Sequence, residues 1–266
     1  MKLSNKNQAR LLSNYGNWAL ITGASSGIGR ELAFQLAESG FNLIINARNS
    51  IELEKLSEEL QTRFNCEIVC AVADLASPEG IQLVIQSAAN YPIGLLVASA
   101  GFGTSGLFIN NALETEVNML RVNCEALLKI THHFSQQFAN QKRGGIVLLS
   151  SIVAFQGVPF SANYAATKAY VQTLAEGIKH ELKPFNVDVL AVAPGPVNTR
   201  FANRAGMHMS VALHPEEVAI SILKSLGKRT TVFPGLLSKV MAYALRTAPR
   251  ALKIKIMGKV MKKMAV

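Results

Sequence analysis

The sequence contains few cysteines, no long apolar run and no apolar leader, and each absence excludes a class of protein. The three cysteines are Cys66, Cys70 and Cys124. Neither another cysteine pair nor a histidine cluster stands at the spacing that would complete a metal site with them. We interpret them as reduced thiols that behave as small buried apolar residues. Residues 1–17 are polar and mixed, so we expect no signal peptide. No stretch of about 18 apolar residues predicts a membrane span, and we expect a cytoplasmic protein.

Acidic residues are missing from the end of the chain. From Val218 onward there are eleven Lys and Arg and no Asp or Glu, so this segment has a net charge of +11. The whole chain has a net charge of +10, which leaves −1 for the residues before Val218. The basic character therefore belongs to the tail, which argues against a nucleic-acid-binding domain. Five histidines lack companions at ligand spacing, and we predict no metal site. They are His132, His133, His180, His208 and His214.

Short apolar runs alternate with helical patterns through most of the 266 residues. We predict strands at residues 18–22, 41–47, 66–72, 93–98, 145–150, 186–192 and 231–233. The alternation favours an α/β fold, a doubly wound, Rossmann-like parallel sheet in a single domain. We expect this domain to cover residues 16–233, with a substrate flap at about 196–214. An N-terminal extension (1–15) and a basic tail (234–266) flank it.

A glycine-rich loop joins the first predicted strand to the first predicted helix. Its sequence, Gly23-Ala-Ser-Ser-Gly27-Ile-Gly29, has the spacing G-x-x-x-G-x-G. Glycines allow a tight turn and a close approach of the backbone to a pyrophosphate, which the free N–H groups of the helix attract. A plain tight turn is the alternative, but the position between a strand and a helix favours a dinucleotide site.

The second predicted strand ends at Ala47 and Arg48, about 20 residues after the glycine loop, where an NAD site has a ribose-binding acid. Arginine can bind a 2′-phosphate through two parallel hydrogen bonds, whereas a carboxylate would repel it. This position therefore favours NADP(H) over NAD(H). The alternative is a solvated arginine at the start of a loop.

Tyr164 and Lys168 stand four residues apart in a helix expected to start near Ser161. Residues at this spacing share one face of a helix, so the phenol and the ammonium can point into the same cleft. A free tyrosine has a pKa of about 10, and a fixed cation nearby stabilises the phenolate and lowers that pKa. The pair can then act as a general acid or base. A surface tyrosine packed on a lysine stem has the same spacing.

Together these motifs resemble the short-chain dehydrogenase/reductase family over roughly residues 16–233. Thr22 to Gly29 is similar to its nucleotide loop, and Tyr164 and Lys168 are similar to its Tyr-x-x-x-Lys pair. Ser151 precedes the tyrosine by thirteen residues, as is usual in that family, and Asn123 matches its active-site asparagine. The segments at 101–106 and 233–237 look similar to a bacterial subgroup of general ketone or acyl-type reductases.

The resemblance implies hydride transfer between a nicotinamide and a carbonyl or alcohol. Tyr164 would protonate the carbonyl oxygen or deprotonate the alcohol, while Lys168 would bind the nicotinamide ribose and lower the pKa of Tyr164. Ser151 would donate a hydrogen bond to the substrate oxygen, and Asn123 would hold a water that relays protons to Lys168. The implied cofactor-binding residues are Gly23, Ser25, Ser26, Gly27, Ile28, Gly29, Arg48, Asp74, Leu75, Ala98, Gly101, Tyr164, Lys168, Pro194, Gly195, Val197 and Thr199.

The sequence departs from the family after the fourth strand. Ala98-Ser99-Ala100-Gly101 stands where the family commonly has Asn-Asn-Ala-Gly. Backbone contacts to a cofactor can survive this change, but the asparagine side chain that would steady the centre of the sheet is missing.

We expect an NADPH-dependent reductase of an apolar ketone, aldehyde or acyl-type carbonyl. The same residues would serve an oxidative alcohol dehydrogenase, and a non-catalytic NADP-binding sensor or scaffold is a third hypothesis. Such proteins are commonly oligomeric, so we expect a homodimer or homotetramer through helices at 113–140 and 161–183. Five phenylalanines could line an apolar pocket or simply pack in the core. They are Phe102, Phe108, Phe155, Phe160 and Phe201.

The basic tail reads as an amphipathic helix over residues 250–264. A helical projection gathers its apolar residues on one side and its lysines on the other, with Lys253 inside the apolar arc. The apolar side holds Leu252, Ile256, Met257, Val260 and Met264, and the basic side holds Lys255, Lys259, Lys262 and Lys263. This pattern suits peripheral contact with an anionic membrane, or equally docking on the domain or on a partner subunit.

Overall fold

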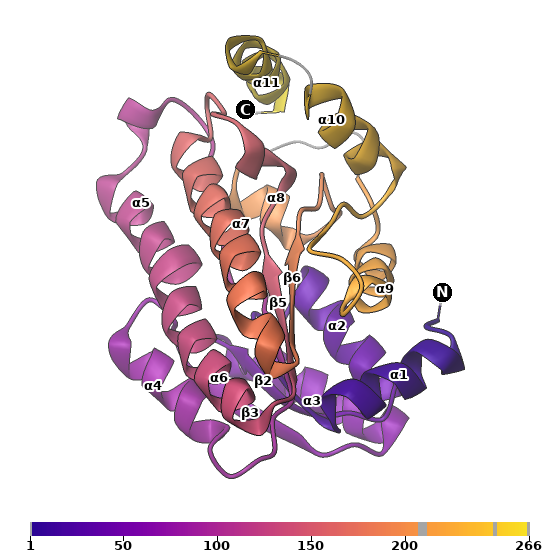
Figure 1. Cartoon of the computed structure of the whole chain (residues 1–266). Coiled ribbons are helices and arrows are strands. Elements are labelled where there is room, and N and C mark those ends of the chain that lie inside the picture. The colour runs from indigo at the N-terminus through magenta and orange to yellow at the C-terminus, as the bar shows by residue number, and fades with distance from the viewer. Residues whose placement is uncertain (1, 207–211, 247–248, 265–266) are drawn as a thin grey trace.

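A parallel seven-stranded sheet forms the centre of the computed structural model, which describes all residues except Met1, 207–211, 247–248 and 265–266 (Figure 1). The strand order is β3-β2-β1-β4-β5-β6-β7. The strands are β1 (Trp18–Thr22), β2 (Asn42–Ala47), β3 (Ile68–Val72), β4 (Leu95–Ala98), β5 (Gly144–Leu149), β6 (Val187–Val192) and β7 (Thr231–Val232). The predicted fold class and all seven predicted strands are confirmed, with ends that differ by up to two residues.

Helices cover both faces of this sheet, as parallel crossovers require. The α-helices are α1 (Asn5–Tyr15), α2 (Gly27–Glu38), α3 (Ser50–Phe64), α4 (Pro78–Ser87), α5 (Leu113–Leu120), α6 (Leu127–Gln141), α7 (Ala162–Leu182), α8 (Arg200–Arg204), α9 (Pro215–Ser225), α10 (Leu236–Arg246) and α11 (Arg250–Met264). A π-helix, η2 (Arg121–Ala126), lies between α5 and α6, and the short helices are η1 (Phe108–Asn110), η3 (Ile152–Phe155) and η4 (Lys183–Phe185).

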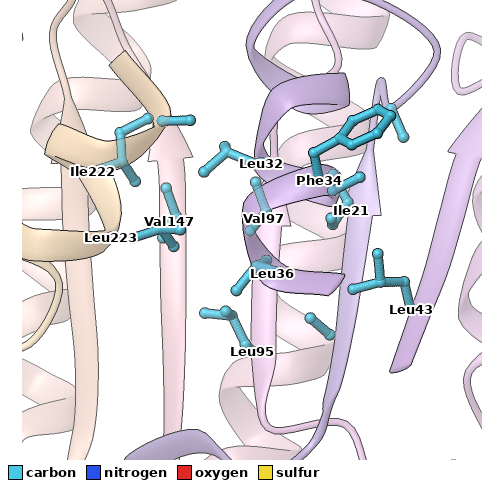
Figure 2. Packing of buried hydrophobic residues seen from close by; sticks show 14 of the residues in the cluster. Ile21, Leu32, Phe34, Leu36, Leu43, Leu95, Val97, Val147, Ile222 and Leu223 are labelled. Atoms are coloured by element: carbon cyan, nitrogen blue, oxygen red, sulfur yellow. The ribbon is translucent and has the colours of Figure 1, made fainter. Parts of the chain in front are cut away.

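The core has two layers because successive strand residues point to opposite faces of the sheet. In β1, Ala19 and Ile21 belong to the layer under α2 and α9, whereas Trp18 and Leu20 belong to the layer under α4, α6 and α7. Figure 2 shows the first layer, in which Leu36 of α2 and Leu223 of α9 face the strands. Strands buried on both faces explain the nearly continuous apolar runs in the sequence.

The strand order reverses at β1. The chain first moves outward through β2 and β3 and then returns to place β4 on the other side of β1. The connections that follow β1 and β4 therefore leave in opposite directions, which opens a crevice at the carboxyl ends of these two strands. The glycine loop after β1 and the Ser99–Gly101 segment after β4 both lie at this crevice.

The N-terminal segment packs on the domain through α1. Leu11 and Tyr15 are fully buried, and the Tyr15 hydroxyl donates a 2.7 Å hydrogen bond to Asp188 at the start of β6. The guanidinium of Arg10 donates hydrogen bonds to the carbonyl oxygens of Leu223 and Leu226 at the end of α9. The polar composition of this segment concealed these few anchoring residues.

The start of α3 and the side that it buries are both set locally. Asn49 caps this helix, because its Oδ1 accepts a hydrogen bond from the Glu52 N–H. Asparagine is among the strongest N-cap residues. Ile51 is 61% exposed, because the turn of about 100° per residue in an α-helix places it opposite the buried Leu53, Leu56 and Leu60.

The basic tail folds back over the carboxyl ends of the strands as α10 and α11, at the top of Figure 1. The predicted helix is confirmed, but its inner side is set by Met257 and Met261, which are buried. Leu252 and Ile256 were predicted to share that side and are exposed. Gly258 allows close contact with Pro159, and Ile254 faces Gly157. Of the two alternatives for the tail, the structure therefore has the docked one.

The described residues include no helix that is both long and apolar enough to cross a bilayer.

Candidate active site

A pocket opens at the carboxyl ends of the strands, and most of the predicted site residues line it. The lining residues that the sequence predicted are Gly23, Ser25, Ser26, Gly27, Ile28, Arg48, Asp74, Leu75, Gly101, Ser151, Tyr164, Lys168, Pro194, Gly195, Val197 and Thr199. Three predicted residues, Gly29, Ala98 and Asn123, lie behind its surface. Segments up to about 240 residues apart in sequence thus meet in one cavity.

The glycine loop makes a cradle with a bare backbone at the start of α2. Gly23 has a φ of +68°, and a Cβ there would lie 2.7 Å from the Cα of Ala100. Gly29 packs against the Gly23 carbonyl, where a Cβ would lie 2.4 Å from the oxygen. Ser26 begins α2 without a side-chain cap, so the first N–H groups of the helix remain for an anion. This geometry fits a pyrophosphate.

Although the asparagine that is usual after β4 is missing, hydrogen bonds still join the strand ends at the centre of the sheet. The Thr22 hydroxyl oxygen accepts hydrogen bonds from the N–H groups of both Ser99 and Ala100, each at 3.2 Å. Asn46 at the end of β2 donates to the carbonyl oxygens of Ala71 and Ala73, at 2.8 and 3.2 Å. These bonds join the ends of neighbouring strands around the crevice.

Arg48 and Asp74 lie at one end of the pocket, beyond β2 and β3. Their side chains form an ion pair of 3.9 Å and are about half exposed. Such an exposed pair contributes little to stability, so the guanidinium can turn to another anion at small cost. This placement is compatible with a 2′-phosphate next to Arg48.

Tyr164, Lys168 and Ser151 converge on the opposite wall of the pocket. The Lys168 Nζ donates a 2.7 Å hydrogen bond to the Leu149 carbonyl at the end of β5, and lies 5.7 Å from the centre of the Tyr164 ring. Ser151 lies two residues after the end of β5 and its side chain hydrogen-bonds that of Tyr164. The predicted shared face of α7 is therefore real.

The electrostatics of this pair differ from the expectation. We expected Lys168 to lower the pKa of Tyr164, but burial raises it to about 12, and only the hydrogen bond with Ser151 acts in the opposite direction. Burial also lowers the pKa of Lys168 to about 8. The cause is desolvation, which disfavours the charged form of each side chain.

Asn123 lies on the π-helix η2 and is fully buried. Its Oδ1 accepts from the Phe102 N–H at 3.0 Å, and its Nδ2 donates to the Phe102 carbonyl at 2.8 Å and to Thr167 Oγ1 at 3.1 Å. Both amide hydrogens are used, so a relay water could bind this side chain only at Oδ1. The proposed water relay stays a prediction.

Glu116 organises the loop that faces Tyr164, and no sequence motif marks this residue. This carboxylate is buried and accepts hydrogen bonds from Thr104, Asn111 and Asn163, at 2.7 to 2.8 Å. Asn163 directly precedes Tyr164 on α7. Glu116 therefore holds the 104–111 loop against the start of α7, and only the tertiary structure brings these partners together.

The tail completes the pocket as a roof of flexible apolar side chains. Met241 of α10 and Met257, Val260, Met261 and Met264 of α11 line the cavity. The Gly195 N–H donates a 3.0 Å hydrogen bond to Ser238 of α10, which is buried. The roof is thus attached to the segment predicted to hold the nicotinamide end. The sequence suggested the helix but not its place over the site.

The predicted flap at about 196–214 is closed at its base by a bridge between Val197 and Leu213. It contains α8, whose Phe201 ring lies 5.3 Å from that of Tyr164. Of the five candidate phenylalanines, Phe102 and Phe201 line the pocket, while Phe108, Phe155 and Phe160 do not. Within the described part of the chain no three His, Cys, Asp or Glu form a metal-binding group, and His208 lies outside it.

Comparison with known proteins identifies relatives over most of the chain. Residues 17–209 match the family model of the short chain dehydrogenases. The 7β-hydroxysteroid dehydrogenase of Clostridium sardiniense is 30% identical over 85% of this chain and 88% of its own length. A very-long-chain 3-oxoacyl-CoA reductase-like protein of Arabidopsis thaliana is 35% identical over 72% of this chain and 63% of its own length.

Solved structures share the fold. One, from work on the stereoselectivity of 7β-hydroxysteroid dehydrogenase, has a TM-score of 0.86 at 26% identity and covers 93% of this chain and 98% of its own. A short-chain dehydrogenase from Sphingobium yanoikuyae in complex with NADPH has a TM-score of 0.80 at 30% identity, covering 89% and 95%.

The lowered pKa of Lys168 predicts how the free energy of unfolding changes with pH. Between pH 8 and pH 10 the unfolded chain, with a lysine pKa of 10.5, binds more protons than the folded chain, with a pKa of about 8. The free energy of unfolding should therefore rise with pH in this interval. We expect the free energy of unfolding of Lys168→Met, measured by urea unfolding at several pH values, to rise less steeply with pH than that of the wild type. Lys224→Met, at an exposed position of α9, should keep the wild-type slope, and an unchanged slope in Lys168→Met would contradict the assignment.

Proposed function

The chain belongs to the short-chain dehydrogenase family and is an oxidoreductase that acts on hydroxyl or carbonyl groups; from this premise we propose that it reduces an apolar ketone, aldehyde or acyl-type carbonyl with NADPH. The observation that carries the proposal is the convergence of Ser151, Tyr164 and Lys168 on one wall of the pocket. The cofactor, when bound, supplies or accepts the hydride.

The cradle of the glycine loop supports a dinucleotide as the cofactor. Bare backbone at Gly23 and Gly27 and the uncapped start of α2 would receive the pyrophosphate. Arg48 would bind the 2′-phosphate at the far end, and the segment from Pro194 to Thr199 would hold the nicotinamide end. The Sphingobium yanoikuyae relative, which contains NADPH, is consistent with this choice.

Tyr164 would transfer the proton to the carbonyl oxygen, or remove it from an alcohol in the reverse direction. Its high pKa in this structure suits the donor role, because the phenol is fully protonated at neutral pH. Ser151 would donate a hydrogen bond to the same substrate oxygen and stabilise charge that develops there. Lys168, close to Gly101 and beneath Tyr164, would bind the nicotinamide ribose.

The apolar character of the substrate is supported by the walls next to Tyr164. Phe201 packs on the tyrosine ring, and the methionines of α11 form a roof above it. Methionine is flexible and polarisable and adapts to irregular apolar shapes. The relatives include enzymes named for hydroxysteroids and for very-long-chain 3-oxoacyl-CoA, both of which are large apolar groups.

A homodimer or homotetramer remains the proposed assembly. Leu120 of α5, Leu128 of α6 and Tyr170 of α7 are large apolar side chains exposed on the helices predicted for the interface. Figure 1 shows α6 and α7 side by side on one flank of the sheet. Exposed apolar residues on neighbouring helices are typical of subunit contacts.

Replacement of the catalytic phenol should separate chemistry from binding. We expect Tyr164→Phe to lower kcat by about 10²–10⁴-fold and to leave the Kd for NADPH unchanged, because the ring still packs on Phe201. Tyr170→Phe, on the same helix but outside the pocket, should keep wild-type kcat. Turnover by Tyr164→Phe at the wild-type rate would favour the sensor or scaffold hypothesis.

Loss of the guanidinium at position 48 should change cofactor preference. We expect Arg48→Ala to raise the Kd for NADPH about ten-fold or more, since charge-assisted bidentate bonds are lost, with little change for NADH. Fluorescence titration with both nucleotides measures this. Arg63→Ala on α3, outside the pocket, is the matched control. Equal weakening of both nucleotides would rule out the 2′-phosphate role.

A charge placed on the proposed interface should dissociate the assembly. We expect light scattering to show an oligomer for wild type and a monomer for Leu128→Glu, because a buried unpaired carboxylate is costly. Leu83→Glu, at an exposed position of α4, should leave the oligomer intact. A wild-type mass in Leu128→Glu would place the interface elsewhere.

A further inference from the structure

Four charged side chains line the pocket, and three of them already have a place in the proposed site. Arg48 and Asp74 pair with each other at the 2′-phosphate end, and Lys168 is bonded to the Leu149 carbonyl beneath Tyr164. The fourth is Arg204, at the end of α8. Within the described part of the chain its side chain has no ion pair or hydrogen bond, so the proposed reaction leaves this cation unexplained.

Arg204 belongs to the substrate side of the pocket. It follows Phe201 by three residues on α8, which places the two on nearly the same face of the helix, and Phe201 packs against the Tyr164 ring. The next residue, Ala205, is buried in one cluster with Met257 and Met261 of the roof. The Ser105 hydroxyl donates a 2.6 Å hydrogen bond to the Ala205 carbonyl, which fixes this end of α8.

The roof of the pocket that Arg204 lines is apolar on its inner side and basic on its outer side. Methionines of α10 and α11 line the cavity, and the outer side of α11 carries exposed Lys255, Lys259, Lys262 and Lys263. The chain from Val218 to the end has no acidic residue. A positive field over the mouth of an apolar cavity raises the local concentration of anions, and a guanidinium binds carboxylate or phosphate with two parallel bonds.

We propose that the substrate is an apolar carbonyl or hydroxyl compound that carries an anionic group, and that Arg204 binds this group while the α11 methionines enclose the apolar body. This inference rests on the proposed function for the location of the reacting carbonyl. It adds a charge requirement that neither the catalytic residues nor the cofactor cradle demands. Carboxylate and phosphate share the chemistry that Arg204 recognises.

Direct binding tests the anion site without turnover. Octanoate and octanamide have the same chain and nearly the same shape but differ in charge at neutral pH. In calorimetric titrations of the full chain saturated with NADP⁺, we expect octanoate to bind about ten-fold more tightly than octanamide. Arg204→Gln should remove this difference, and Arg204→Lys should retain part of it, since the positive charge remains.

Arg200→Gln is the matched control, because Arg200 lies on the same helix and pairs with Glu52, at 3.4 Å, outside the pocket. It should keep the preference for octanoate. Arg204 is exposed, so its replacement should leave the unfolding midpoint and the Kd for NADPH unchanged. Equal binding of octanoate and octanamide to wild type would overturn the proposal, as would a preference that survives in Arg204→Gln. Weaker NADPH binding in Arg204→Gln would instead assign this arginine to the cofactor.

Turnover extends the test to the reaction. With NADPH saturating, kcat/KM for a medium-chain keto acid should exceed that for its primary amide by about ten-fold, and Arg204→Gln should lower the value for the acid alone. Reduction of both compounds at equal kcat/KM would leave the oxidoreductase intact and overturn the anion requirement. Arg204-dependent binding of octanoate with no reduction of any carbonyl would support the anion site and contradict the proposed reaction.

Discussion

The reversal of strand order at β1 is the constraint on which the rest of the structure depends. Parallel strands need crossovers on both faces of the sheet, and the chain leaves β1 and β4 on opposite sides. A crevice therefore opens between those two exits. The glycine loop, the Ser99–Gly101 segment and Ser151 all line the pocket at this edge of the sheet, so the topology places the residues to which the proposed function assigns the cofactor and the proton transfer. Thr22 then closes the crevice floor with hydrogen bonds to the two N–H groups that follow β4.

Desolvation is the second organising effect, and it explains why the site looks different from a simple tyrosine–lysine pair. Tyr164 and Lys168 lie at the wall of a pocket roofed by methionines, and burial raises the pKa of the tyrosine and lowers that of the lysine. The phenol is therefore protonated at neutral pH, while the ammonium loses its proton more readily than that of a solvated lysine; Ser151 and the Leu149 carbonyl are the hydrogen-bond partners. A charged ligand that enters this space meets little competing water, so its electrostatic effect on Tyr164 and Lys168 is strong.

The sequence predicted well wherever function and local structure use neighbouring residues. The glycine loop, the strand ends and the spacing of Tyr164 and Lys168 each occupy a short stretch, and all were placed where the structure has them. Predictions failed where packing on a distant segment decides which side of a helix is buried, as with Leu252 and Ile256 in α11. Glu116 and Ser238 were missed because their partners, Asn163 and Gly195, lie 47 and 43 residues away. No local pattern marks such partners.

By itself, then, the sequence determined the parallel α/β fold, the glycine-rich loop between β1 and α2 and the shared helix face of Tyr164 and Lys168. Strand periodicity, glycine spacing and a four-residue interval on a helix are local properties that the chain carries before it folds. Only the tertiary structure decided what encloses the reacting groups. The position of α11 above the pocket, the convergence of Phe201 and Arg204 on its wall and the sign of the pKa shifts all depend on packing between distant segments. Burial, which sets those shifts, is a property of the assembled chain and of no single stretch of it.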